Sequence, residues 1–328
     1  MFNQHSPKFA LAPMAGFTDA AFRRICGSFG ADYAVSEMIS AVALTRDDAK
    51  TAELAKITPG EPPVVLQIFG RDPAVMARAA ELLLSGDYRG CSYAAPPAGI
   101  DINMGCPVRK IVSNGEGSAL MLDPDRAARI MAAVREVCER HGVPASVKFR
   151  LGWDSEISPA FARRMAEAGA QKITLHCRTR AQMYAPSADP SAAGRTADAL
   201  RDIAAGPLVG NGDITSRRTA QVYLDGGCRE VAIGRAALGD PWLFRRLKHP
   251  EEPDDARPSL GEIKSLVLSF VADVVREKGE ERGVRESRSR AAYFIKGMRG
   301  SAALRDRLNR AVTMEQFASA VEAWEPEP

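Results

Sequence analysis

The feature that most constrains the fold is a series of eight short apolar segments within the first 235 residues, most of them separated by helical patterns. These strand-like segments are Phe9–Ala12, Tyr33–Ser36, Val64–Phe69, Ile100–Met104, Ala145–Phe149, Ile173–His176, Leu208–Gly210 and Val231–Ile233. Strands that alternate with helices pair in parallel, and eight such units are typical of a (β/α)8 barrel. A doubly wound open sheet is disfavoured because no G-x-G-x-x-G follows the first segment. We therefore predict an α/β fold, a TIM barrel.

Proline and glycine positions mark helices between the strands and a second region beyond them. Barrel helices are predicted at Asp19–Gly30, Pro73–Leu84, Pro124–Arg140, Pro159–Ala168 and Ser216–Leu224. The polar, proline-rich stretch Pro250–Pro258 is typical of a linker. Further helical patterns follow at Ser259–Lys278, Ser287–Gly300 and Met314–Trp324. We expect a catalytic barrel domain over residues 1–248 and a small helical domain over residues 259–328.

Composition and cysteine usage exclude several classes of protein. An apolar fraction of 45% and a charged fraction of 26% are ordinary for a folded soluble protein. No apolar run is long enough to cross a membrane, and residues 1–5 lack the pattern of a secretory signal, so we expect a cytoplasmic protein. The six cysteines form no C-x-x-C pair and the histidines number only four, so we expect reduced thiols and no metal site. We expect the protein to be a monomer.

The charge distribution is more informative than the net charge of +3. Between Arg285 and Arg310 eight basic residues face only Glu286 and Asp306. A locally basic segment suits a polyanionic partner. Taken alone, however, this segment is better explained as a solvated helical face.

Polar or reactive groups occur at the C-terminal end of nearly every predicted strand, where barrels of this kind have their active sites. These groups are Pro13-Met14-Ala15-Gly16, Glu37, Gln67, Asn103 with Gly105-Cys106-Pro107, Lys148 and Arg150, His176 and Arg178, Asn211-Gly212-Asp213, and Gly234-Arg235. A barrel with a purely structural role has no need of such groups at so many strand ends. The pattern therefore favours an enzyme.

Part of this set predicts a phosphorylated, flat cofactor. Gly212 and Gly234 follow the last two strands, where backbone N–H groups often bind phosphate, and Arg235 adds a positive charge. The polar side chains expected to hydrogen-bond a heteroaromatic ring are Gln67, Lys148 and His176. Either glycine alone would be an ordinary turn and a lone histidine a core residue, but the combination favours a flavin-like cofactor at the barrel mouth.

Cys106 is the candidate reactive thiol. It follows the fourth strand and lies in a glycine-containing loop that suits a lid. Nothing in the sequence visibly lowers its pKa, so we expect a proton donor rather than a thiolate nucleophile. The cysteines expected to be structural are Cys26, Cys138, Cys177 and Cys228.

These motifs resemble those of the tRNA-dihydrouridine synthase family. The resemblance is carried by Ala12-Pro13-Met14-Ala15-Gly16, Asn103-Met104-Gly105-Cys106-Pro107, Val147-Lys148-Phe149-Arg150, Leu175-His176-Cys177-Arg178-Thr179-Arg180, Asn211-Gly212-Asp213-Ile214 and Ile233-Gly234-Arg235. Order and spacing match from about residue 9 to residue 246, and the stretch Ile102–Leu122 is most similar to the bacterial B and C types.

The resemblance implies FMN as cofactor, NADPH as reductant and tRNA as substrate. The implied contacts to the isoalloxazine ring are Pro13, Met14 and Ala15, with hydrogen bonds from Gln67, Lys148 and His176. The implied phosphate site is made by Asn211, Gly212, Asp213, Gly234 and Arg235. Cys106 would be the proton donor, and the residues implied to bind the target uracil are Asn103, Arg150 and Arg178.

The implied reaction reduces specific uridines of tRNA to 5,6-dihydrouridine. Hydride passes from flavin N5 to uracil C6, and Cys106 protonates C5 from the opposite face. The uridine has to leave its stack to reach the cofactor, and the folded tRNA would be recognised by shape and phosphates. Two departures from the family pattern, Pro190 after Ala188-Asp189 and Arg290-Ala291-Ala292 in the C-terminal region, leave the modified position open.

Two other functions stay open on the sequence alone. A dihydroorotate or dihydropyrimidine dehydrogenase would use the same cofactor and a loop cysteine on a free pyrimidine, but it would not need the basic helical region at 259–324. A catalytically silent tRNA-binding protein would not need the intact set of residues at the strand ends.

Overall fold

The barrel predicted from the sequence is present and closed. The structure is a computed structural model that describes residues 6–203 and 206–325, so the expectation about residues 1–5 lies outside the described residues. The strands are β1 Lys8–Leu11, β2 Tyr33–Val35, β3 Ile39–Ser40, β4 Val64–Phe69, β5 Gly99–Met104, β6 Ala145–Arg150, β7 Lys172–His176, β8 Leu208–Asn211 and β9 Glu230–Ile233. Their order is β2-β1-β9-β8-β7-β6-β5-β4-β3, and a further β2–β4 pairing closes the ring. All eight predicted strands are confirmed; the two-residue β3 was too short to predict.

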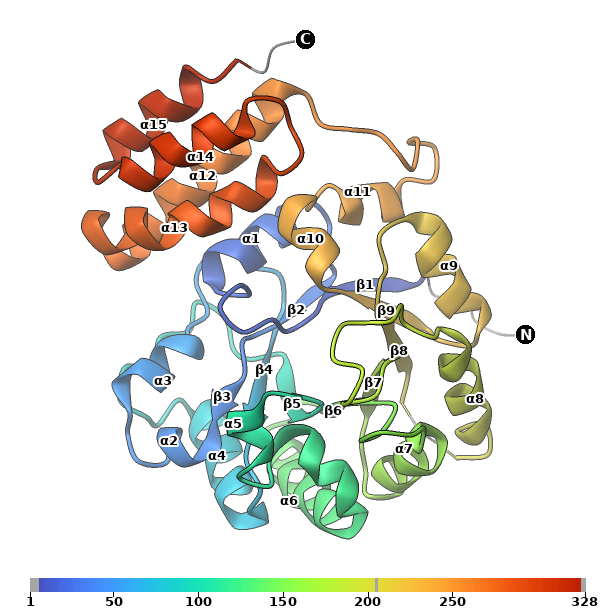
Figure 1. The fold of residues 1–328 in the computed structure, drawn as a ribbon. Helices are drawn as coiled ribbons and strands as arrows, with labels where there is room; N and C mark the ends of the chain where they lie inside the picture. Colours follow the sequence, from blue (N-terminus) through green and yellow to red (C-terminus); the bar gives the residue numbers. More distant parts are fainter. Residues whose placement is uncertain (1–5, 204–205, 326–328) are drawn as a thin grey trace.

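Helices surround the barrel (Figure 1). They are α1 Ala20–Ser28, α2 Ala41–Leu44, α3 Ala49–Leu54, α4 Pro73–Ser85, α5 Arg109–Val112, a 3-10 helix at Gly117–Leu122, α6 Pro124–Arg140, α7 Ser158–Glu167, α8 Ser191–Ala199, α9 Arg217–Asp225, α10 Arg235–Gly239 and α11 Leu243–Lys248. Asp72 and Asp123 cap α4 and α6 by accepting a backbone N–H, and a proline follows each cap. This local chemistry explains why the predicted helix starts are confirmed.

The side chains inside the barrel fall into an apolar half and a polar half. Small and apolar residues from β1, β2, β8 and β9 form one cluster: Ala10, Ala12, Tyr33, Val35, Val209 and Ala232. The buried polar residues of β4 to β8 include Gln67, Asp101, Asn103, Ser146, Arg150, Thr174 and Asn211. Because side chains alternate along a strand, the residues between them, such as Ile100 and Ile102, face the helices and belong to the main core. The polar half leads up to the strand ends where the site was predicted.

Four helices follow the barrel: α12 Leu260–Lys278, α13 Glu280–Phe294, α14 Ser301–Arg310 and α15 Met314–Glu322. The predicted helix at Ser287–Gly300 was wrong at both ends, and α14 was missed. Gly279, with φ of 79°, separates α12 from α13, and Gly297 and Gly300 also have positive φ between α13 and α14. The first turn of α13 is Glu280-Glu281-Arg282-Gly283, which has no apolar period and so gave no helical signal.

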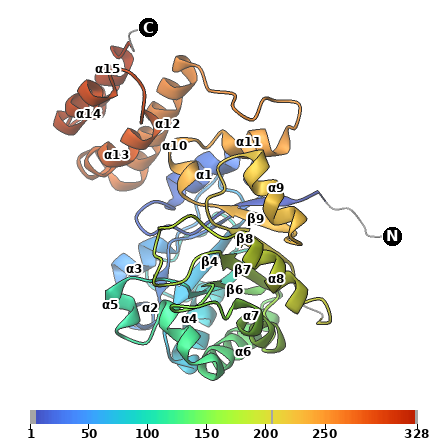
Figure 2. The same cartoon turned by 45° about the vertical axis from the view of Figure 1, so that its right-hand side comes forward.

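The C-terminal helices pack against one side of the barrel, beside α1 and α10, in both views (Figures 1 and 2). Phe22 of α1 lies 6.4 Å from Phe294 of α13, measured between ring centroids. Arg24 of α1 donates a hydrogen bond of 3.0 Å to Asp273 of α12. Arg290 forms a two-pronged ion pair with Asp19, at the start of α1. Since Asp19 follows the end of β1, the helical region adjoins the rim that carries the strand ends.

Two expected absences concern membranes and metals. Within residues 6–203 and 206–325, no helix combines the length and apolar character needed to cross a bilayer. In the same described parts of the chain, no three His, Cys, Asp or Glu side chains are grouped so as to hold a metal ion.

The close crossing of α12 and α13 depends on Gly283, since a Cβ there would lie 2.6 Å from the Cα of Val275. We predict that Gly283→Ala lowers the free energy of unfolding by about 1–3 kcal/mol, because backbone cannot move aside as a side chain can. Gly261 in α12 has nothing within 4 Å of such a Cβ, so Gly261→Ala is the matched control. It should stabilise by about 0.5–1 kcal/mol. Urea unfolding measures both, and equal stability of Gly283→Ala and wild type would contradict this packing.

Candidate active site at the barrel mouth

The register of the sheet brings four predicted site residues to consecutive, neighbouring strands. Asn103 of β5 pairs with Lys148 of β6, and His176 of β7 pairs with Asn211 of β8. Lys148 and His176 are also electrostatic neighbours, since the Lys148 charge helps to lower the pKa of His176. The predicted group of side chains therefore does assemble at one rim of the barrel.

Lys148 lacks a hydrogen-bonding partner for its amine among the described residues. Burial lowers the pKa of this lysine to about 8, and the nearby Arg150 charge acts in the same direction, while the buried Asp101 opposes it. An ammonium group in such surroundings is energetically costly unless a partner is supplied. Lys148 is therefore suited to meet an electron-rich or anionic group that enters the mouth.

His176 is held in one tautomer. The Asn211 amide nitrogen donates 2.7 Å to the Ala232 carbonyl, which leaves its Oδ1 to face His176 Nδ1 at 2.8 Å. Nδ1 therefore carries the hydrogen, and Nε2 is an acceptor, 3.5 Å from Arg178 Nη1. Burial lowers the pKa of His176 well below its ordinary value, assisted by the charges of Lys148 and Arg150. A neutral imidazole follows, with Nδ1 as donor and Nε2 as an acceptor that has only a long contact from Arg178 among the described residues.

The Cys106 loop is fixed through its backbone. The Asn103 side-chain oxygen accepts from the N–H groups of Gly105, at 3.1 Å, and Cys106, at 2.9 Å. The Cys106 carbonyl accepts from both the N–H, at 3.0 Å, and the hydroxyl, at 2.9 Å, of Ser118. Cys106 itself is partly exposed, and burial raises the pKa of its thiol despite the opposing charges of Arg150 and Lys148. At neutral pH the group is a protonated thiol, as the role of an acid requires.

Arg150 links the Cys106 loop to the loop that follows β7. Its Nε donates 2.8 Å to the Gly105 carbonyl, and its Nη1 donates to the carbonyls of Thr179, at 3.1 Å, and Met183, at 2.9 Å. Only 4% of the residue is exposed, and these bonds use three of its five N–H donors. The predicted contact between Arg150 and uracil stays a prediction, and the structure shows a second role in holding two loops together.

Gly212 and Asp213, two residues of the predicted phosphate site, have positive φ and are fixed by close packing and ion pairs. Gly212 has φ of 130°, and a Cβ there would come within 2.8 Å of Ala188 Cβ, so only glycine fits. Asp213 has positive φ and accepts from Arg178, at 2.5 Å, and Arg235, at 2.9 Å. A carboxylate would repel phosphate, so Asp213 would act through its backbone and through Arg235. About half of the Arg235 side chain is exposed, which leaves its guanidinium accessible.

Arg178 is almost completely buried. Its Nε donates 2.7 Å to the Pro186 carbonyl, and Nη2 pairs with Asp213. Its predicted contact with a substrate base stays untested. The β1–α1 loop is more open: Pro13 and Met14 are partly buried, Ala15 is exposed, and Met14 sulfur would lie 3.6 Å from a Cβ at Gly234. This loop and Gly234, a residue of the predicted phosphate site, are therefore neighbours.

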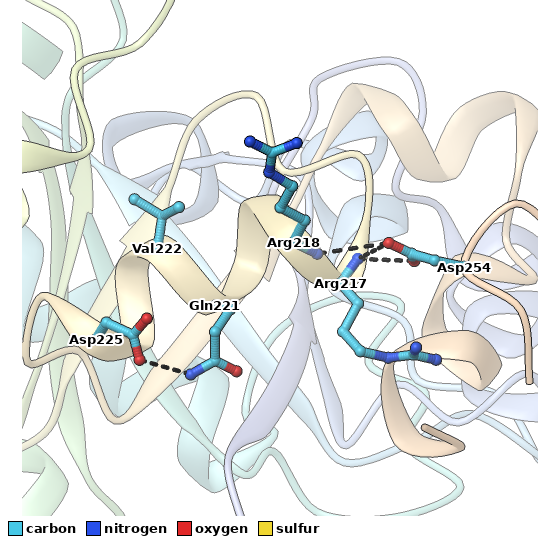
Figure 3. Close-up of a pocket in the computed structure, with 6 residues that line it drawn as sticks. All are labelled: Arg217, Arg218, Gln221, Val222, Asp225 and Asp254. Carbon is cyan, nitrogen blue, oxygen red and sulfur yellow. Dashed lines mark hydrogen bonds between the residues drawn. The ribbon is translucent and has the colours of Figure 1, made fainter. Parts of the chain in front are cut away.

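A pocket of about 460 Å³ lies elsewhere, along the outer helix α9 (Figure 3). It is lined by Arg217, Arg218, Gln221, Val222, Asp225 and Asp254. Asp254 accepts from the Arg217 N–H at 2.8 Å, so a carboxylate already occupies the start of α9. None of the predicted site residues lines this pocket, and it is not the strand-end site.

Comparison with known proteins identifies the family. The family model described as "Dihydrouridine synthase (Dus)" matches residues 10–326. The tRNA-dihydrouridine synthase B of Xanthomonas campestris pv. campestris is 37% identical, with 94% of this chain and 90% of that protein covered. The Pseudomonas aeruginosa protein of the same name is 35% identical, with 92% and 88% covered. This chain belongs to the dihydrouridine synthase family.

The dihydrouridine synthase match confirms the family predicted from the motifs and extends it over the C-terminal helices. Among solved structures, the old yellow enzyme homologue from Zymomonas mobilis has a TM-score of 0.51 at 15% identity, covering 76% of this chain and 90% of that one. At this identity the likeness bears on the fold alone, and it agrees with the predicted barrel.

Two residues of this dihydrouridine synthase gained no role from the sequence. The Tyr184 ring is 54% exposed and lies 5.0 Å from Arg235 Cζ and 6.0 Å from Arg150 Cζ. Glu37 accepts from the Gly16 N–H at 2.5 Å, and burial raises its pKa. A tyrosine in a polar loop gives no periodic signal. The position of Glu37 at a strand end follows from the sequence, but its hydrogen bond from Gly16 in the Met14–Gly16 loop is visible only in the tertiary structure.

The depressed pKa of Lys148 has a consequence for stability. In the flavin-free protein the folded state binds this proton less tightly than the unfolded chain, so Lys148 destabilises below about pH 8 and the penalty disappears as pH rises toward 10.5. We predict that Lys148→Met raises the melting temperature most below pH 8, with the difference from wild type shrinking at higher pH. Scanning calorimetry from pH 6.5 to 10 tests this. A difference independent of pH would contradict the buried charge.

Proposed function

We propose that the protein reduces specific uridines in tRNA to 5,6-dihydrouridine, with FMN as cofactor and NADPH as reductant. The observation that carries the proposal is a protonated thiol on a fixed loop, Cys106, above a mouth that also holds Lys148 and His176. The printed names of the relatives, which are tRNA-dihydrouridine synthases, support the same reaction.

The residues present fit FMN. Lys148 offers an unpartnered amine, and the neutral His176 offers Nε2, whose contact with Arg178 is long, at 3.5 Å, so both suit the edge of an isoalloxazine ring. Gly212, Gly234 and Arg235 suit the phosphate. Pro13, Met14 and Ala15 would contact the ring face. When bound and reduced by NADPH, FMN would supply the hydride for uracil C6.

The chain's own groups would complete the reduction. The Cys106 thiol would transfer its proton to uracil C5, so that the C5=C6 double bond gains one hydride and one proton. Asn103 and Arg150 bind the N–H and the carbonyl of the Gly105–Cys106 peptide, and Ser118 binds the Cys106 carbonyl, so the backbone on both sides of this thiol is held. Lys148 would offset the negative charge of the reduced ring. The exposed Tyr184 ring offers a surface on which an extruded base could stack.

The C-terminal helices are proposed to bind tRNA. Of the eight basic residues between 285 and 310, Arg288 binds the Ala311 carbonyl and Arg290 binds Asp19. The other six are exposed: Arg285, Lys296, Arg299, Arg305, Arg307 and Arg310. Such side chains are available for phosphate contacts, which a free pyrimidine would not require.

The reaction is tested directly on the purified protein. Its visible spectrum is recorded, and NADPH oxidation and dihydrouridine formation are then measured with unmodified tRNA and, separately, with free uracil and orotate. The proposal expects flavin bands and turnover of tRNA alone. Turnover of free pyrimidines with no reaction on tRNA would favour a dihydropyrimidine-type dehydrogenase. A protein that cannot be loaded with FMN would overturn the cofactor assignment.

Cys106→Ala should retain the flavin spectrum and NADPH oxidation but lose about 10²–10⁴-fold in the rate of dihydrouridine formation, because only the proton donor is removed. Cys91→Ala is the matched control, since Cys91 lies in the loop before β5 at the opposite end of the strands. Single-turnover assays with pre-reduced enzyme separate the two half-reactions. An unchanged rate in Cys106→Ala would remove this residue from the mechanism.

Charge reversal at two exposed positions tests the tRNA surface. We predict that Arg299→Glu with Arg305→Glu weakens tRNA binding by about tenfold or more and reduces its salt dependence, with FMN content unchanged. Arg129→Glu is the control, because Arg129 is equally exposed but lies on α6, across the barrel from α12–α15 (Figure 1). Filter binding at two salt concentrations measures the effect. Equal losses in all variants would exclude a specific surface.

A further inference from the structure

A chain of side-chain hydrogen bonds runs from a buried carboxylate to the backbone of the Cys106 loop. Gln67 Nε2 donates 2.7 Å to Asp101 Oδ2. Asn103 Nδ2 then donates 2.8 Å to Gln67 Oε1. Asn103 Oδ1 in turn accepts from the N–H groups of Gly105 and Cys106. Every link is buried or partly buried, and Asp101 itself is 3% exposed.

The donors and acceptors of this hydrogen-bond chain can be arranged in only one direction. An amide side chain has a donor end and an acceptor end, which can exchange places by a half-turn. Rotating Gln67 would set its oxygen against the Asp101 carboxylate and its nitrogen against the Asn103 nitrogen. Rotating Asn103 to follow would point its nitrogen at two backbone N–H groups, leaving all of them unsatisfied. The acceptor at the Asp101 end therefore decides which way both amides face.

We propose that Asp101 is a positioning residue for the reaction: it fixes the orientation of Gln67 and Asn103 and thereby the position of the Cys106 loop. The catalytic consequence rests on the proposed function, whereas the effect on the loop does not. Asp101 makes no hydrogen bond to Cys106, and the hydrogen-bonded route from Asp101 to the Cys106 loop runs through the two amides.

If the Asp101 charge mattered, a neutral substitution at this position would have an effect; if only the orientation of the two amides matters, a neutral acceptor should be enough. Burial raises the pKa of Asp101, while hydrogen bonds from Gln67 and Ser146 and the charge of Lys148 oppose the rise. In Asp101→Asn the new amide oxygen can still accept from Gln67. Its nitrogen can donate to Ser146 Oγ, whose own hydrogen has the Ile100 carbonyl 3.3 Å away. The amide chain is thus preserved without the charge, whereas Asp101→Leu interrupts it.

The experiment is hydrogen exchange measured by mass spectrometry on the purified full-length protein, combined with steady-state kinetics on tRNA. In Asp101→Leu, the Gly105 and Cys106 amides should exchange about tenfold faster, and kcat should fall with little change in KM for tRNA. Asp101→Asn should restore both to near wild type. Ser146→Ala is the matched control, because Ser146 donates 2.6 Å to the other carboxylate oxygen and lies off the route to Cys106. Exchange of the backbone amides of β7 is the internal reference, since it would rise if a variant destabilised the whole barrel.

Each outcome decides the proposal. Unchanged exchange at Gly105 and Cys106 in a folded Asp101→Leu protein overturns it, as does an Asp101→Asn protein as impaired as Asp101→Leu, which would assign the effect to charge. If Asp101→Leu does not fold, Gln67→Met interrupts the same chain one link later and must give the same faster exchange. A wild type that makes no dihydrouridine would refute the proposed function, while the exchange comparison would still decide the role of Asp101.

Discussion

Closure of the parallel barrel, completed by the pairing of β2 with β4, is the constraint on which the rest of the structure depends. In a closed parallel barrel all carboxyl ends meet at one rim, so residues as distant in sequence as Met14 and Gly234 become neighbours. Closure also shields most inward-facing side chains from bulk water, although Lys148 and His176 at the rim are partly exposed. Each buried polar group inside must therefore form a hydrogen bond within the protein or with a bound ligand.

Most interior polar groups do find a partner. Near the amino ends of the strands, Glu230 accepts from both Tyr33 and Lys172 at 2.7 Å. In the middle, Asp101 is satisfied by Gln67 and Ser146. At the carboxyl rim the pattern changes, since the Lys148 amine is left without a hydrogen bond among the described residues and its pKa falls to about 8. An unsatisfied cation at the rim above a satisfied interior is the physical signature of a binding site rather than of a structural core.

The sequence predicted the barrel well because each strand is a compact apolar segment and two helices, α4 and α6, begin at an Asp-Pro pair. It also placed the reactive residues at the rim, since that follows from barrel closure. The sequence did not show which groups each buried polar side chain binds. The predicted contacts of Arg150 and Arg178 with uracil stay predictions, and the sequence did not show that their guanidinium groups also bind loop carbonyls and Asp213, which depends on loop paths. The C-terminal helices were partly misplaced because α13 begins with charged residues and has no apolar period there.

The motif Asp101-Ile102-Asn103 in β5 already indicates, from the sequence alone, that polar side chains lie inside the barrel. Two polar residues separated by one apolar residue in a buried strand share a face, so both had to point into the barrel and be paired. That pattern indicates an internal network beneath the cysteine loop. The identity of the third member, Gln67, follows only from the register between β4 and β5, where Gln67 lies opposite Asp101.

A crystal structure of the FMN-loaded protein tests the account most directly. The account predicts a phosphate bound by the backbone of Gly212 and Gly234 and by Arg235. It also predicts the isoalloxazine edge at Lys148 and His176, with the Cys106 thiol facing the space above the ring. A flavin bound outside the barrel rim, or a ring whose edge contacts neither Lys148 nor His176, would contradict it.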